Sequence, residues 1–355
     1  MTLTINRELL PEAEYERNQI LKTYFCELVA SATAVGEKWS IELSRPHKAD
    51  FYIDLDLEEG LRWWSSNFGA TDVAGIPFAL SRPQGWQISL NDSWTIYSWS
   101  RWLTESVPTH ALPASLTVLH LDDHDDLMAP RVLADGENFR DLITGSQIDL
   151  WRPETVEAAV RSGAIGIGSF MAPFFHQFKS VHVRHLCSTE YSKSRQGAHF
   201  VRPLIILDDL IAPGSRRLGL ELRRLESEAD AVHQQTHPYL VTDDLSSWLE
   251  GLPEGPVLIH IDMDYFNNRF NGDSDWVDYG PKYDPPLSDV LARIDAVFAS
   301  LENSKVTERV VDLAVGLSPG FFPAELWAPS IERIQSLVES LIAAKKWPVG
   351  GHHGN

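Results

Sequence analysis

The sequence of 355 residues is poor in cysteine and has no long apolar run. Only Cys26 and Cys187 occur, which argues against a disulfide framework and is typical of a reducing compartment. No apolar stretch approaches the roughly 18 residues that a membrane span requires. The first residues lack a basic region followed by an apolar stretch, so no secretory signal is expected. These absences predict a cytoplasmic protein that does not bind a membrane.

Basic side chains are also scarce. Lysine and arginine total 30 against 50 aspartates and glutamates, which gives a formal net charge of −20. A nucleic-acid-binding protein needs a basic footprint for the phosphate backbone, so this balance argues against that class. An acidic field attracts cations, either metal ions or a basic substrate. Acidity that only maintains solubility is the alternative interpretation.

The apolar segments that are present are short and alternate with helical patterns. Those rich in Val, Ile and Leu are interpreted as buried strands at residues 115–121, 164–170, 203–210, 256–262 and 310–318. Amphipathic patterns predict helices at residues 12–31, 154–163, 217–235 and 330–347. This alternation predicts a three-layer α/β fold, with a mostly parallel sheet flanked by helices. In such sheets functional groups gather at the carboxyl ends of the strands.

The beginning of the chain fits this alternation less well. Residues 48–67 (KADFYIDLDLEEGLRWWSSN) suggest a strand and a helix. We interpret residues 1–70 as an N-terminal elaboration packed on the core, or as a contact in a homo-oligomer, and residues 71–355 as the main domain. The final GGHHGN is expected to be a frayed tail.

One acidic cluster directly follows a predicted strand, in VLHLDDHDDLMAP (118–130). If the strand continues through it, Asp122, His124 and Asp126 share one face, while Asp123 and Asp125 point away. Two carboxylates and an imidazole suit Mn²⁺, Fe²⁺, Zn²⁺ or Ni²⁺ better than Ca²⁺ or Mg²⁺. The alternative is an exposed acidic turn with an incidental histidine.

A second cluster favours the metal interpretation. LIHIDMDYF (258–266) ends another apolar strand with Asp262 and Asp264, again two residues apart. Ligands from two strand ends are enough to hold two divalent ions about 3.5 Å apart. Asp54 and Asp56 have the same spacing but no histidine, so a solvated turn is expected there. His182 and His185 lack acidic neighbours and are expected to be core or surface histidines.

The two clusters resemble the D-x-H-x-D and D-x-D motifs of arginases and other ureohydrolases, in the same order along the chain. The similarity is greater to a divergent branch of that superfamily, which includes the peptide arginases. In that branch an LHLDSHPDL-like stretch is followed by DLDYF-like and SPxxxPxE-like stretches, and the last corresponds here to LSPGFFPAEL (317–326). The resemblance covers roughly residues 85–345 and implies an arginase-like metallohydrolase domain.

The resemblance also implies roles for individual residues, with two Mn²⁺ ions, or other divalent transition metals, as cofactors. Asp122 and Asp262 would bridge the two ions, Asp126 and Asp264 would each bind one, and His124 would bind the second. Asp92 lies near the place where ureohydrolases have a further histidine ligand, and could replace it. Catalytic roles are expected for Asp126 as a proton shuttle, for His120 as a helper that supports the ligands, and for Glu325 as a carboxylate near the guanidinium.

A peptide arginase converts arginine side chains of a ribosomally made precursor peptide into ornithine and releases urea. This is the function that the resemblance implies, with the precursor peptide as partner. Three alternatives remain open at this stage. They are a ureohydrolase acting on free arginine or another guanidino compound, a metal-dependent amide hydrolase or deacetylase on the same scaffold, and a binding protein that keeps the metal motif for stability.

Overall fold

A large sheet forms the centre of the protein. The computed structural model describes residues 2–25, 28–107, 113–136, 138–188, 193–225, 237–272 and 284–347. The sheet has twelve strands in the order β4-β5-β15-β14-β6-β10-β13-β11-β12-β7-β8-β9. In that order the strands are Leu80–Ser81, Gln87–Ser89, Val310–Gly316, Val257–Asp262, Leu116–Leu121, Val181–Leu186, Pro238–Thr242, Gly197–Leu207, Arg216–Arg224, Val132–Asp135, Asn138–Asp141 and Gln147–Ile148.

The direction of the strands changes across this sheet. In the centre of the sheet six consecutive strands are parallel to one another, from β5 through β15, β14, β6 and β10 to β13. The pairings at both ends of the sheet are antiparallel. The α/β class is therefore confirmed, but the expected mostly parallel sheet is wrong, because antiparallel pairings slightly outnumber parallel ones. The physical reason lies in hairpins such as β11–β12. Its turn is held by the Asp208 carboxylate, whose Oδ2 accepts the N–H of Ala212 at 2.6 Å.

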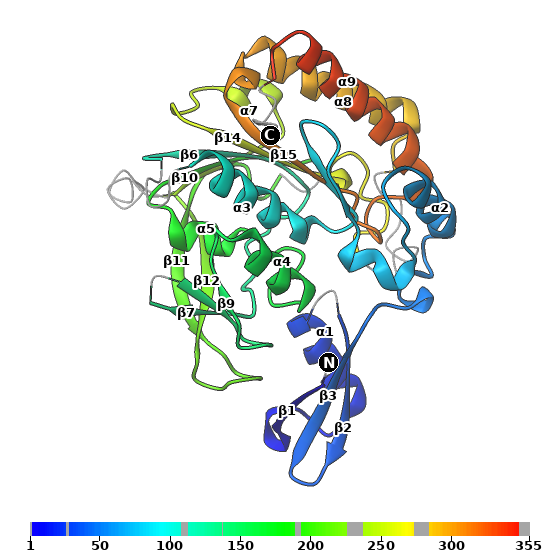
Figure 1. Ribbon diagram of the computed structural model, residues 1–355, viewed down its shortest axis with the longest axis vertical. Helices are drawn as coiled ribbons and strands as arrows, with labels where there is room; N and C mark the ends of the chain where they lie inside the picture. The colour runs from blue at the N-terminus through cyan, green and yellow to red at the C-terminus, as the bar shows by residue number, and fades with distance from the viewer. Residues whose placement is uncertain are drawn as a thin grey trace.

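Helices cover both faces of the sheet (Figure 1). On one face lie α3 (Thr95–Ser106), α4 (Pro153–Arg161) and α5 (Ala172–Gln177). On the other lie α2 (Leu57–Asn67), α7 (Leu245–Leu249), α8 (Leu287–Asn303) and α9 (Trp327–Ala343). Strand β6 contributes to both cores: Leu116 and Val118 pack toward α3, and Leu119 and Leu121 toward α9. This double burial explains why β6 is apolar at nearly every position.

Most of the predicted elements are present. The strands expected at 115–121, 256–262 and 310–318 are β6, β14 and β15, and that at 203–210 overlaps β11. The helices expected at 154–163 and 330–347 are α4 and α9, and residues 12–31 contain α1 (Glu14–Phe25) followed by a strand. No described helix is long and apolar enough to cross a membrane.

Three predicted elements are wrong. Residues 164–170 form turns, with Gly168 at φ 66°, and no strand. Residues 217–224 of the expected helix at 217–235 belong to β12, because Leu218, Leu220 and Leu222 alternate with Gly219 and Glu221 at the period of a strand. The rest of that helix, from residue 226, lies outside the described residues, as does the GGHHGN tail. Residues 48–51 form a 3₁₀ turn, η2 (Lys48–Phe51), and not a strand.

The N-terminal residues form a separate small sheet. Strands β1 (Thr2–Asn6), β3 (Lys38–Ser44) and β2 (Val29–Val35) are antiparallel, and α1 packs beside them at the lower end of the view in Figure 1. Tyr24 of α1 ties this unit to the large sheet: its hydroxyl donates to Asp208 at 2.6 Å, and its carbonyl accepts from Arg131 at 2.7 Å. Asp208 in turn pairs with Arg217 of β12 at 3.0 Å.

Candidate metal centre

The two acidic clusters meet at the carboxyl ends of β6 and β14, which are neighbouring parallel strands. Strand β6 ends at Leu121, so the chain is already turning when it reaches Asp122. After Asp262, the last residue of β14, the short 3₁₀ helix η6 (Met263–Tyr265) carries Asp264. The expected ligands therefore converge, but not by the strand alternation assumed from the spacing. The turns after the strands bring them together.

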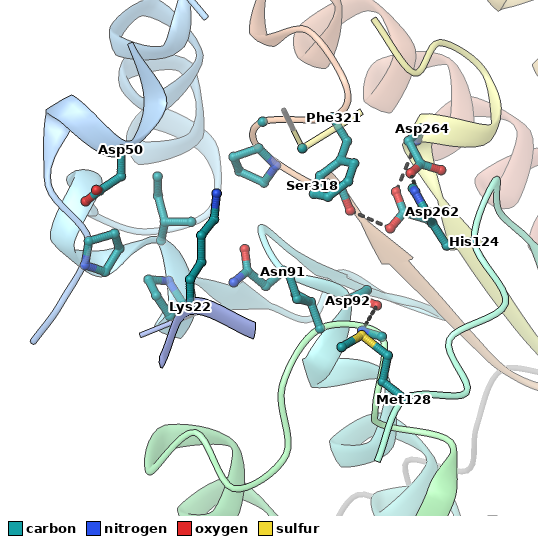
Figure 2. A pocket seen from close by; sticks show the side chains of 18 of the residues that line it. Lys22, Asp50, Asn91, Asp92, His124, Met128, Asp262, Asp264, Ser318 and Phe321 are labelled. Carbon is teal, nitrogen blue, oxygen red and sulfur yellow. Dashed lines mark hydrogen bonds and ion pairs between the residues drawn. The ribbon is translucent and has the colours of Figure 1, made fainter. Parts of the chain in front are cut away.

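One group of ligands consists of Asp122, His124 and Asp264. The Nδ1 atom of His124 lies 2.9 Å from Oδ2 of Asp264 and 3.3 Å from Oδ1 of Asp122. The backbone N–H of His124 also donates to Oδ1 of Asp122 at 2.6 Å, which fixes the turn. Figure 2 shows His124, Asp262 and Asp264 together at one end of a pocket.

Asp262 is held beside this group from two sides. Its Oδ1 accepts the N–H of Asp264 at 3.1 Å, and its Oδ2 accepts the hydroxyl of Ser318 at 2.5 Å. Ser318 follows β15 and has a positive φ of 48°, which turns the chain over the site. The LSPGFFPAEL stretch therefore contributes directly to the centre.

A second group lies deeper and consists of His120, Asp122, Asp126 and His260. The Nε2 atom of His120 is 3.8 Å from Oδ2 of Asp122 and 4.0 Å from Oδ2 of Asp126. Both oxygens are buried, and neither has a hydrogen-bond partner within the described part of the chain. Asp126 reaches this position with φ 52°, a conformation that aspartate tolerates better than most residues. The two groups share Asp122.

Burial and mutual repulsion disfavour the ionised carboxylates. Burial raises the pKa of Asp122 well above its usual value, and the nearby Asp264 and Asp262 raise it further. Burial also raises the pKa of Asp126, with Asp122 adding to the effect, and that of Asp262, with Asp264 and Asp92 adding. The centre is therefore short of positive charge.

His124 supplies part of that charge. Burial alone would lower the pKa of its imidazole, but the carboxylates of Asp264, Asp126 and Asp262 outweigh burial and raise the pKa to about 10. A bound divalent ion would take over this role and would leave the imidazole neutral as a ligand. Oxygen and imidazole donors in this proportion fit Mn²⁺, Fe²⁺ or Zn²⁺, and the two buried oxygens without donors are the places that a cation would satisfy.

Asp92 lines the pocket but belongs to neither ligand group. It begins the 3₁₀ helix η4 (Asp92–Trp94), and its Oδ2 accepts the N–H of Gly168 at 3.3 Å. A Cβ at Gly316 of β15 would come within 3.2 Å of the Asp92 Cα, so only glycine allows η4 to approach the sheet this closely. Asp92 is close enough to raise the pKa of Asp262.

Glu325 is placed away from the centre. It lies on η9 (Ala324–Leu326), forms an ion pair with Arg269, and is not among the residues that line the pocket. The neighbouring Asp54, expected to be solvated, is buried instead: its Oδ2 accepts the N–H of Ala324 at 3.1 Å. Burial raises the pKa of Asp54 to about 6.

The two remaining aspartates of the first cluster lie outside both ligand groups. Oδ1 of Asp123 accepts the N–H of Ser188 at 2.9 Å, beyond the end of β10. Oδ1 of Asp125 is 3.1 Å from Nη1 of Arg195, and its side chain is 28% exposed. The division of the cluster into ligands and non-ligands remains a prediction, and the turn after β6, not strand alternation, separates the two sets of side chains.

The structure adds residues that sequence reasoning missed. His260 belongs to the deeper ligand group, and Nε2 of His185 contacts the carbonyl of Asp122 at 2.9 Å. The signal was present in the sequence: HLD (120–122), HLC (185–187) and HID (260–262) each place a histidine one or two residues before the last residue of a central strand. Phe321 was also missed; its ring centroid lies 5.2 Å from that of His124.

The pocket extends well beyond the metal ligands. Its volume is about 840 Å³. Figure 2 shows Asp262, Asp264 and His124 at one end and Lys22 of α1 and Asp50 of η2 at the other. The N-terminal unit therefore forms one wall of the pocket.

Comparison with known proteins adds no family to this description: no family model matches the chain, and no curated protein is significantly similar to it. The likeness to ureohydrolases therefore rests on the motifs alone.

Proposed function

We propose that this protein is a metal-dependent hydrolase that cleaves a guanidinium group with two divalent ions, Mn²⁺ being the first candidate. The observation that carries the proposal is the pair of ligand groups that share Asp122 at the carboxyl ends of β6 and β14. Paired ions bridged by shared carboxylates are suited to hydrolytic chemistry. An arginase-like fold, with the N-terminal unit as an elaboration, forms part of the same proposal.

The overall reaction takes up one water molecule. A C–O bond forms at the guanidinium carbon, the bond from that carbon to the side-chain nitrogen breaks, and the products are urea and the protonated amine of ornithine. Two bound ions would supply a water that is acidic enough to act as a nucleophile near neutral pH.

The protein's own residues have separate roles in this scheme. Asp122, Asp262, Asp264, Asp126 and His124 hold the ions, with Asp92 as a further candidate. Asp126 is also the candidate for moving a proton from the water to the leaving nitrogen, because its carboxylate lies in the deeper ligand group beside Asp122. His120 supports the ligands from below. Glu325 does not line the pocket and pairs with Arg269, so the proposal assigns it no contact with the guanidinium.

We further propose that the arginine is part of a peptide. A pocket of about 840 Å³ is large for a single amino-acid side chain and falls within the range for larger ligands. Its outer end is lined by polar residues of α1 and η2, and Figure 2 shows Lys22 and Asp50 at the opposite end from Asp262, Asp264 and His124.

The test compares substrates on one preparation. The protein is loaded with Mn²⁺ and incubated with an arginine-containing peptide, free arginine and an acetyl-lysine peptide, while urea and acetate are measured. We expect urea from the arginine peptide, less from free arginine, and no acetate. Acetate release would identify an amide hydrolase instead. The proposal is wrong if no guanidino substrate yields urea while the metal is bound.

A further inference from the structure

Three histidines lie side by side beneath the carboxylates. Strands β10, β6 and β14 are neighbours, and their register pairs His185 with His120 and His120 with His260. All three side chains are completely buried. The ring of His120 stacks on that of His260, with centroids 5.1 Å apart and planes at 16°, and its centroid lies 4.6 Å from that of His185.

His120 is the histidine of this row that faces the inner carboxylates. Its Nε2 atom lies 3.8 Å from Oδ2 of Asp122 and 4.0 Å from Oδ2 of Asp126. Two ligands bound at about 2.0–2.2 Å to one ion can be no more than about 4.4 Å apart, so both distances from Nε2 of His120 are within this limit. The two carboxylate oxygens are buried and have no donor among the described residues.

His260 fixes the ring of His120. Their Nδ1 atoms are 2.9 Å apart, so one ring donates its proton to the other. If Nε2 of His120 binds an ion, its proton sits on Nδ1 and is donated to His260. Histidine ligands in proteins usually have their second nitrogen held in this way. Phe170 packs against His260, with ring centroids 4.8 Å apart, and holds the pair in place.

We propose that His120 supplies the imidazole ligand of the inner metal ion, and that His260 is the residue that positions it. The imidazole would then come from the strand beneath the ion and not from the position of Asp92. This inference rests on the metal centre of the proposed function, but it does not depend on the guanidinium chemistry.

A purely structural role makes a different prediction. The Nε2 atom of His120 is also 3.0 Å from the carbonyl oxygen of His124. If the proton of the neutral His120 ring is on Nε2 and is donated to the carbonyl of His124, Nε2 has no lone pair to bind a metal. The two roles can be separated by asking whether this nitrogen bonds to an ion.

The direct test uses the wild-type protein labelled with ¹⁵N-histidine and loaded with ¹¹³Cd²⁺. A one-bond coupling between cadmium and a ring nitrogen appears only where the nitrogen binds the ion. We expect coupling to Nε2 of His120 as well as to a ring nitrogen of His124. Coupling to His124 alone would overturn the proposal. The result does not depend on whether a variant folds.

Calorimetric titration with Mn²⁺ provides the second test. In His120→Gln the amide can still donate to the His124 carbonyl, so a structural role is preserved while the imidazole is lost. We expect His120→Gln and His260→Gln to weaken binding of one ion by about 10- to 100-fold or more, and to leave the other ion's affinity close to that of the wild type. His182→Gln is the control, since His182 lies on β10 outside both ligand groups.

Two outcomes of the titration separate this inference from the proposed function. If His120→Gln binds both ions like the wild type, His120 is not a ligand, whatever the protein hydrolyses. If the coupling and the affinities are as expected but no guanidino substrate is cleaved, His120 remains a ligand and the proposed function fails.

Discussion

Nδ1 of His124 lies 2.9 Å from Oδ2 of Asp264, and this contact joins two acidic motifs that are far apart in the sequence. Each motif follows a strand of the same parallel pair, so the sheet itself brings them together. Several properties of the centre depend on this proximity and can be measured.

Neighbouring aspartates of the first motif should differ sharply in importance. Asp125 is partly exposed and pairs with Arg195, whereas Asp126 is buried in the inner ligand group. We expect Asp125→Asn to change kcat/KM by no more than about fivefold, as for an exposed ion pair. Asp126→Asn should reduce kcat/KM by at least about 100-fold. Steady-state kinetics of both variants measures these changes, and their melting temperatures serve as a folding control. Similar reductions of kcat/KM in the two variants would contradict the assignment of Asp126, and not Asp125, to the inner ligand group.

Metal affinity should rise with pH. Burial and neighbouring carboxylates raise the pKa values of Asp122, Asp126 and Asp262, and the carboxylates raise that of His124 to about 10. Without metal these groups keep their protons to a higher pH than ordinary aspartates and histidines do, and a binding ion must displace those protons. Each proton released makes the affinity about tenfold higher per pH unit. Titration calorimetry between pH 6 and 8, in buffers of different ionisation enthalpy, counts these protons. An affinity independent of pH would show that the ligands are already deprotonated.

Phe321 should contribute to binding of a flat cation. Its ring lines the pocket and meets the edge of His124 at the mouth of the metal centre. A guanidinium over an aromatic face gains about 0.5–2 kcal/mol, so Phe321→Leu should raise KM by about 2- to 30-fold. We expect kcat to change much less, because Phe321 belongs to neither ligand group. If Phe321→Leu lowers kcat and leaves KM unchanged, the ring of Phe321 positions the metal ligands and does not bind the substrate.

Stability should respond to pH at a site remote from the metal. Asp312 of β15 is partly buried beside Ser98, whose hydroxyl donates to it at 2.7 Å, and removal of its carboxyl from water raises the pKa of Asp312 to about 7. Between pH about 4 and 7 the folded protein retains a proton that the unfolded chain has lost. This contribution to stability is therefore present below pH 4 and lost as the pH rises to 7, by about 1.4 kcal/mol per unit of pKa difference.

The variant Asp312→Asn removes this titration. The free energy of unfolding of the variant minus that of the wild type should be more positive at pH 8 than at pH 5, as measured by urea unfolding at the two pH values. The same difference at both pH values would show that Asp312 does not titrate in this range.

Local patterns in the sequence were sufficient to predict three strands at the centre of the large sheet. The apolar runs of β6, β14 and β15 identified the strands that carry the ligands, and the order of the two motifs indicated which residues meet. The antiparallel pairing of β11 with β12 was missed, because this hairpin depends on a turn at Asp208 and because Leu218, Leu220 and Leu222 were assigned to a helix.

The candidate metal ligands stand out in the sequence more clearly than the residues packed around them. Asp122, His124 and Asp264 belong to compact motifs, whereas His260 becomes part of the centre only through the register of β14 against β6. Long-range register of this kind is not visible in a local pattern. Glu325 was chosen for its position after the last strand, but its carboxylate pairs with Arg269.

The most direct test of the account is the mass of an arginine-containing peptide after incubation with the Mn²⁺-loaded protein. The account predicts that the arginine loses the mass expected for conversion to ornithine, that an equal amount of urea appears, and that oxygen from ¹⁸O-labelled water is found in the urea. The matched Asp264→Asn variant should leave the peptide unchanged. An unaltered peptide mass with two metal equivalents bound to the wild-type protein would contradict the central claim.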